Sequence, residues 1–92
     1  MQVILCKIQF GVYDQEIYQA DEYGHSKLIA KAPLEVLDKT LVSLCFDKKI
    51  DEIYLYGIQD IAVQLAQDIN KVEYSLYSDN KIKVEVNKAW NI

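Results

Sequence analysis

Residues 51–69 of this chain read DEIYLYGIQDIAVQLAQDI, and the stretch changes character at its single glycine. Residues 53–56 are β-branched, aromatic or leucine, which favours a strand. After Gly57 the apolar residues recur at intervals of three and four, which predicts an amphipathic helix; they are Ile58, Ile61, Ala62, Leu65, Ala66 and Ile69. A strand that passes directly into a helix is typical of α/β architecture.

The chain before this unit is predicted to be an antiparallel meander of three strands. In residues 3–10 the apolar side chains alternate, so that one face of the first strand carries Ile4, Cys6, Ile8 and Phe10. Gly11 permits a turn, and residues 13–20 continue the extended pattern. The polar residues 21–26 form a hairpin loop, after which residues 27–31 return as a third strand.

A first helix follows the meander. Pro33, the only proline, suits the first turn of a helix, and Glu35 complements the positive end of the helix dipole. Leucines and a cysteine then recur at helical spacing up to Lys48. At the other end of the chain, residues 72–77 and 82–86 alternate on either side of the turn 78–80, which predicts a terminal hairpin.

The order of elements is therefore three-strand meander, helix, strand, helix and hairpin, in a single domain over residues 1–92. The fold class is α/β with a mixed (α+β type) sheet. Strand–helix–strand crossovers are right-handed, and two such crossovers that proceed in one direction across the sheet would place both helices on one face, which is the arrangement we expect. Cys6 and Cys45 have apolar neighbours and are expected to be core residues, although a single bridge between them is an alternative.

This order resembles the ribonuclease H-like fold. The resemblance covers residues 1 to about 77, and it implies metal-binding carboxylates on strand one, helix one and strand four. Here strand one offers Lys7 and Gln9, strand four ends in Tyr56 and Gly57, and Glu35 has no partner. The catalytic site of that fold is therefore expected to be missing, and we predict no catalytic residues, no metal and no cofactor.

The chain contains many Lys, Ile, Tyr and Asn residues, and its segment DEIYLYG leads into an amphipathic helix. In both features it resembles small uncharacterised proteins of low-GC bacteria and their phages.

The charged residues reduce the number of function classes that we expect. All ten cations are lysine and the net charge is −4. Without the bidentate arginine fork, binding of nucleic acids and phosphoryl transfer are not expected. AT-rich codons offer an alternative explanation for the missing arginine. No long apolar segment is present, so we expect a cytoplasmic protein without membrane contact.

Tyrosine is the positive signal, with seven copies. If both helices cover the Ile-Leu-Val face of the sheet, the strand pattern places several tyrosines on the opposite face. Tyrosine is favoured at protein interfaces, and simple β-propensity is the alternative reason for its abundance. The predicted interface residues are Tyr18, Tyr54, Tyr56, Tyr77 and Trp90.

The predicted function is that of a non-enzymatic protein-interaction module, a homodimer or a phage-type binder of a host protein. Two alternatives remain open. One is a small-molecule or nucleotide binder that uses the turn at Gly57, Ile58 and Gln59 at the start of the second helix. The other is a divergent nuclease-like domain.

Overall fold

The computed structural model describes residues 1–88. Its elements, in chain order, are β1 (Gln2–Ile8), β2 (Asp14–Asp21), β3 (Ser26–Pro33), a 3₁₀ turn η1 (Leu34–Val36), α1 (Leu37–Lys48), β4 (Glu52–Gly57), α2 (Gln59–Tyr77) and β5 (Lys83–Val86). Among these residues, no helix is long and apolar enough to cross a membrane.

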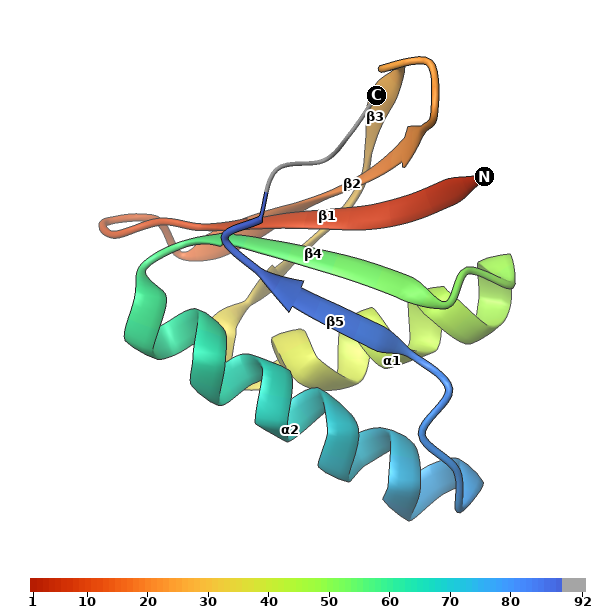
Figure 1. Cartoon of the computed structure of the whole chain (residues 1–92). Coiled ribbons are helices and arrows are strands. Elements are labelled where there is room, and N and C mark those ends of the chain that lie inside the picture. The colour runs from red at the N-terminus through yellow and green to blue at the C-terminus, as the bar shows by residue number, and fades with distance from the viewer. Residues whose placement is uncertain (89–92) are drawn as a thin grey trace.

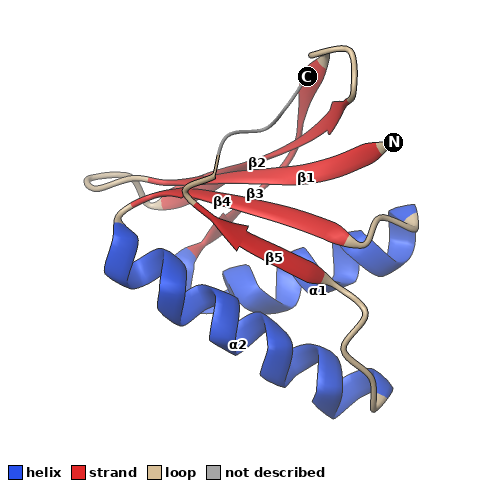
Figure 2. Cartoon of the chain, in the orientation of Figure 1, coloured by secondary structure: helices blue, strands red, loops and turns tan. Residues whose placement is uncertain are grey.

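The five strands form one mixed sheet in the order β3-β2-β1-β4-β5. The first three strands are antiparallel neighbours, whereas β4 runs parallel to β1 and β5 runs parallel to β4. Both helices lie against the same face of this sheet and run in the same direction (Figure 1, Figure 2). The predicted mixed α/β sheet, with a meander followed by helix, strand and helix, is confirmed.

The hydrophobic core lies between the sheet and the two helices. It is built from the alternate strand residues and the inner helix positions, which include Ile4, Cys6, Ile8, Ile17, Leu37, Leu41, Cys45, Ile53, Leu55, Ala62, Leu65 and Ile69. Cys6 and Cys45 are both buried free thiols, so they pack as core residues and do not form a bridge. Burial raises the pKa of each thiol to about 12, with nearby Glu73 and Asp51 adding to the effect at Cys45.

The predicted terminal hairpin is wrong. Residues 72–77 are the last turns of α2, and within the described residues 1–88 β5 pairs with β4 alone. The helical pattern was not recognised beyond Ile69 because the next inward position, four residues later, is the charged residue Glu73. This residue interrupts the row of apolar side chains on the inner face of α2. The alternation of a strand would place Tyr74 and Leu76 on the core face together with Val72, but both side chains are 63% exposed.

Glu73 explains why the chain can turn after α2 and enter the sheet as a parallel strand. Its side chain is fully buried and accepts hydrogen bonds from the backbone N–H of Lys81 at 2.7 Å and of Ile82 at 3.1 and 3.3 Å. These N–H groups precede β5 and would otherwise lack a partner close to the core. One buried carboxylate therefore holds the connection between α2 and β5.

Two predicted details of the first half also change. Phe10 does not lie on the core face of β1 but in the β1–β2 loop, where it is 80% exposed. That loop is closed by the buried Gln15, whose side chain exchanges hydrogen bonds with the backbone N–H and C=O of Gln9 at 2.9 and 3.2 Å. Pro33 ends β3, and the chain passes through η1 before α1 begins at Leu37. Pro33 therefore does mark a change of secondary structure, but a proline can mark the end of a strand as well as the start of a helix.

Candidate interaction surface

The face of the sheet opposite the helices carries a row of large side chains. In the strand register, Leu5 of the central strand pairs with Tyr18 of β2 on one side and with Tyr54 of β4 on the other. Tyr18 in turn pairs with Leu28 of β3, and Tyr54 with Glu85 of β5. Directly paired residues point to the same side of a sheet. We call this row of five residues, with Lys7, Glu16, Tyr56 and Lys31 beside it, the open face.

A short repeat builds the centre of the open face. The tripeptide Glu-Ile-Tyr occurs at residues 16–18 in β2 and at residues 52–54 in β4, on the two strands that flank β1. In each copy the isoleucine is fully buried toward the helices while the other two side chains share the open face. Strand alternation predicted the tyrosines but not this repeat, which becomes visible in the sequence when the two strands are aligned.

Each tyrosine hydroxyl donates a hydrogen bond to the glutamate of its own tripeptide. The Tyr18 hydroxyl lies 3.0 Å from Glu16 Oε1, and the Tyr54 hydroxyl lies 3.3 Å from Glu52 Oε2. The hydrogen bond to Glu16, then desolvation, raises the pKa of Tyr18, whereas desolvation, then the charge of Glu52, raises that of Tyr54. Both phenols therefore stay protonated and act as donors, with their rings held in place against the sheet.

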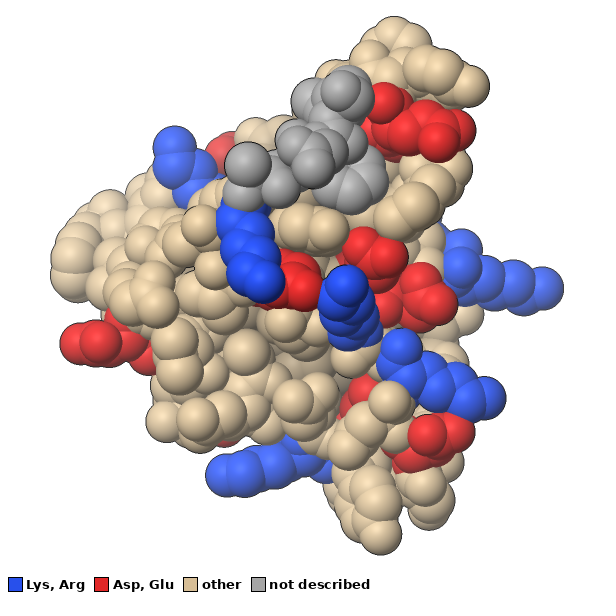
Figure 3. Space-filling model, in the orientation of Figure 1, with Lys and Arg blue, Asp and Glu red and all other residues tan. Residues whose placement is uncertain are grey.

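Charges of both signs surround these rings. Lys31 Nζ lies 4.0 Å from Glu16, and on β5 the Glu85 carboxylate is contacted by Lys83 at 3.5 Å and by Lys88 at 2.9 Å. The hydrogen bond from Lys88 is the main cause that lowers the pKa of Glu85. Figure 3 shows lysine and acidic side chains lying next to one another on the visible side of the molecule. The open face has no field of a single sign.

The open face is also hollowed. A pocket of about 440 Å³ lies among Leu5, Cys6, Lys7, Tyr18, Ser26 and Tyr56. Such a volume falls within the range of sites that hold a small molecule or a large side chain. Its polar groups include an ammonium and phenol oxygens, which suits an aromatic or apolar group with a polar end.

The predicted interface residues separate into three groups. Tyr18, Tyr54 and Tyr56 lie together, half-buried, on the open face. Tyr77 does not join them, because it is the last residue of α2 and its ring stacks on Phe46 of α1 at a centroid distance of 3.8 Å. Trp90 lies outside the described residues.

The turn proposed for ligand binding is occupied by a side chain of the protein. Gly57 N–H donates to Asn87 Oδ1 at 3.0 Å, and Asn87 Nδ2 donates to Gln59 Oε1 at 2.6 Å. Gly57 itself is required there: its φ is +113°, and a Cβ would lie 2.1 Å from the carbonyl oxygen of Ile8. Ile58 is the residue before α2 and its carbonyl accepts from Ala62. The Gly57 N–H that an anion would use is already bonded.

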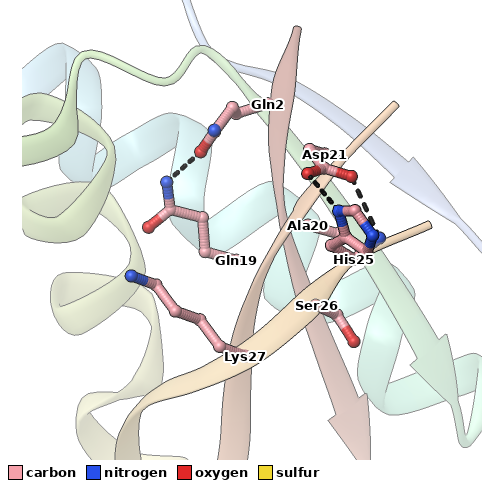
Figure 4. A pocket seen from close by; sticks show the side chains of 7 residues that line it. All are labelled: Gln2, Gln19, Ala20, Asp21, His25, Ser26 and Lys27. Atoms are coloured by element: carbon pink, nitrogen blue, oxygen red, sulfur yellow. Dashed lines mark hydrogen bonds and ion pairs between the residues drawn. The ribbon is translucent and has the colours of Figure 1, made fainter. Parts of the chain in front are cut away.

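A second polar hollow, of about 250 Å³, lies beside the β2–β3 turn and is lined by Gln2, Gln19, Ala20, Asp21, His25, Ser26 and Lys27 (Figure 4). Asp21 Oδ1 accepts the backbone N–H of Tyr23 at 2.9 Å and of His25 at 3.0 Å, and Oδ2 lies 3.2 Å from His25 Nδ1. Desolvation raises the pKa of Asp21, but these hydrogen bonds and His25 outweigh it, and the net shift is downward. Asp21 therefore shapes the turn.

The ribonuclease H-like resemblance implies metal-binding carboxylates on strand one, helix one and strand four, and only the position on helix one carries a carboxylate in this chain. Lys7 and Tyr56 are paired neighbours on the open face, and Glu35 is an exposed residue of η1. Within residues 1–88, no three His, Cys, Asp or Glu side chains gather closely enough to hold a metal ion. The resemblance itself stays a prediction.

A comparison with known proteins finds no family model that matches this chain and no similar sequence among curated proteins.

Proposed function

We propose that this protein is a non-enzymatic interaction module that forms a twofold homodimer through its open face. The observation that carries the proposal is the row in which Leu5 is flanked by Tyr18 and Tyr54. The two tyrosine rings are oriented by hydrogen bonds to Glu16 and Glu52, and with the leucine side chain they provide a large contact area at low entropic cost.

Charge supports a second copy of this chain as the partner. A twofold interface brings the same patch together twice, so it must be complementary to itself. A face of one sign would repel its copy, whereas the lysines and glutamates of the open face alternate and offer opposite charges to one another. The molecule measures 32 × 32 × 21 Å, so one broad face is large enough for the roughly 800 Å² per partner that stable interfaces bury.

A partner of different sequence, such as a host protein bound by a phage-type module, is the alternative use of the same face. The outer edge of β5, which replaces the edge of the predicted hairpin, would extend that surface. We propose that the protein acts in the cytoplasm, because both of its cysteines are free thiols, as expected in a reducing compartment.

Light scattering coupled to size-exclusion chromatography tests the homodimer. The wild-type protein is expected at twice the chain mass of 10.6 kDa. Leu5→Lys places a charge at the centre of the row and is expected to give the monomer mass. Val63→Lys is the matched control, since Val63 is a partly exposed apolar residue of α2, and it should remain dimeric. A monomeric wild type, or a dimer that survives Leu5→Lys, would refute the homodimer.

A further inference from the structure

The groove between the two helices, on the opposite side of the molecule from the open face, is lined by a second repeated pattern. Lysine is followed four residues later by Ser-Leu at Lys39 and Ser43 in α1, and again at Lys71 and Ser75 in α2. A separation of four residues places both side chains of each pair on one face of its helix. Both copies, with Val72 and Leu76, line one pocket of about 520 Å³.

The direction of the helices sets the order of groups along this groove. Because α1 and α2 run the same way (Figure 1), the two lysines belong to the earlier turns and the two serines to the next. Beyond the serines, Phe46 and Tyr77 stack with an interplanar angle of 18° and join the ends of the two helices. The groove therefore has a cationic end, hydroxyl groups in its middle and apolar side chains along its length.

The lining of this groove is positively charged, although the chain is acidic overall. The chain as a whole carries −4, yet the pocket is lined by two lysines and by no carboxylate. Neither Lys39 nor Lys71 forms an ion pair with any of residues 1–88, whereas several lysines on other faces do. Two ammonium groups that face one pocket repel each other, and an anion between them relieves that repulsion.

We infer that the α1–α2 groove is a binding site for a soluble amphiphilic anion, an alkyl chain or ring that carries a phosphate or carboxylate. The ammonium groups of Lys39 and Lys71 bind the anion, Ser43 and Ser75 donate hydrogen bonds to it, and Leu76 packs against the apolar body. The pocket volume is within the range of small-molecule sites. A ligand with an anionic group and an apolar body would contact both the lysine and serine side chains and the apolar side chains of the lining. This site shares no residue with the open face.

Titration of the ¹⁵N-labelled protein with decyl phosphate, followed by amide chemical shifts, tests this inference. Shifts are expected at residues 39–46 and 71–77, with much weaker effects from inorganic phosphate and from the uncharged decyl maltoside. The double variant Lys39→Gln, Lys71→Gln is expected to weaken binding about tenfold. The control Lys27→Gln, Lys81→Gln removes the same charge at positions that belong neither to the groove nor to the open face, and it should bind as the wild type does.

Ser75→Trp provides a second test that leaves every charge in place. Position 75 is exposed, so the indole can be accommodated without disturbing the core, and it should fill the groove and abolish binding. No binding of decyl phosphate at millimolar concentration, or equal weakening by both lysine double variants, would overturn the inference. Sedimentation with phosphatidylglycerol vesicles but no binding of monomeric decyl phosphate would also overturn it, in favour of a membrane surface.

Discussion

Replacement of Glu73 by alanine is expected to lower the free energy of unfolding by about 3 kcal/mol, because Glu73 is the only hydrogen-bond acceptor within residues 1–88 for two backbone N–H groups. A hydrogen bond to a charged group contributes roughly 1.5–3 kcal/mol when its partner is buried. The Ile82 amide is buried and should carry that full cost, whereas the Lys81 amide is partly exposed and water can replace its bond. Relief of the desolvation of the carboxylate offsets some of the loss.

Thermal unfolding followed by far-ultraviolet circular dichroism measures this effect. For a domain of this size, about 3 kcal/mol corresponds to a fall in Tm of roughly 12–24 °C. Glu73→Gln keeps the shape and one acceptor oxygen, so about half of the loss is expected. Glu35→Ala is the control, since that glutamate is exposed, and it should change the stability by no more than about 0.5 kcal/mol.

Amide hydrogen exchange separates a local from a global effect. In Glu73→Ala the amides of Lys81 and Ile82 are expected to lose protection first, because they lose their acceptor, and the strand β5 that follows should exchange faster than β1. If Glu73→Ala and Glu35→Ala unfold at the same temperature, the carboxylate does not hold the connection between α2 and β5, and our account of the parallel fifth strand fails.

Three other predictions concern single positions. Gly57→Ala should lower the free energy of unfolding by about 3 kcal/mol or more, because the new methyl group would meet the β1 backbone and the residue keeps a positive φ. Gly11 also has a positive φ but open space around it, so Gly11→Ala should lower the free energy of unfolding by only about 1 kcal/mol, as measured by thermal denaturation. The thiols of Cys6 and Cys45 should not react with Ellman's reagent at mildly alkaline pH, given their pKa of about 12, until urea unfolds the chain; rapid labelling of the native protein would contradict their burial. Because the folded-state pKa of Asp21 lies below its ordinary value of 3.8, its stabilising effect is present above that value and is lost as the pH falls through the folded-state pKa. The difference in Tm between the wild type and Asp21→Asn should therefore shrink on acidification, and a constant difference would argue against this linkage.

The parts of the fold that the sequence predicted correctly are those whose pattern is local. The strand 53–56 and the first turns of α2 follow from adjacent residues, since β-branched and aromatic residues suit a strand and a three-four spacing suits a helix. The mixed sheet and the common side of the helices follow from the handedness of crossovers. Of the open face, Tyr18, Tyr54 and Tyr56 could be selected because side chains alternate along a strand.

The end of α2 could not be read from its residues. Six alternating positions from 72 to 77 fit a strand as well as a helix, and the inward position is the carboxylate of Glu73. That carboxylate is tolerable inside the protein only because Lys81 and Ile82, eight and nine residues later, return to donate to it. The same misassignment moved Tyr77 from the end of α2 to a strand.

The amino-acid sequence by itself determined the class of this protein and the phase of its strands, because both depend on the period of neighbouring side chains. Only the tertiary structure decided which distant residues meet. The pairing of Leu5 with both Glu-Ile-Tyr tripeptides depends on strand register across the sheet, and the pairing of Lys39 with Lys71 depends on two helices running side by side. Such contacts join segments far apart in the chain, and their geometry is set by packing of the whole core.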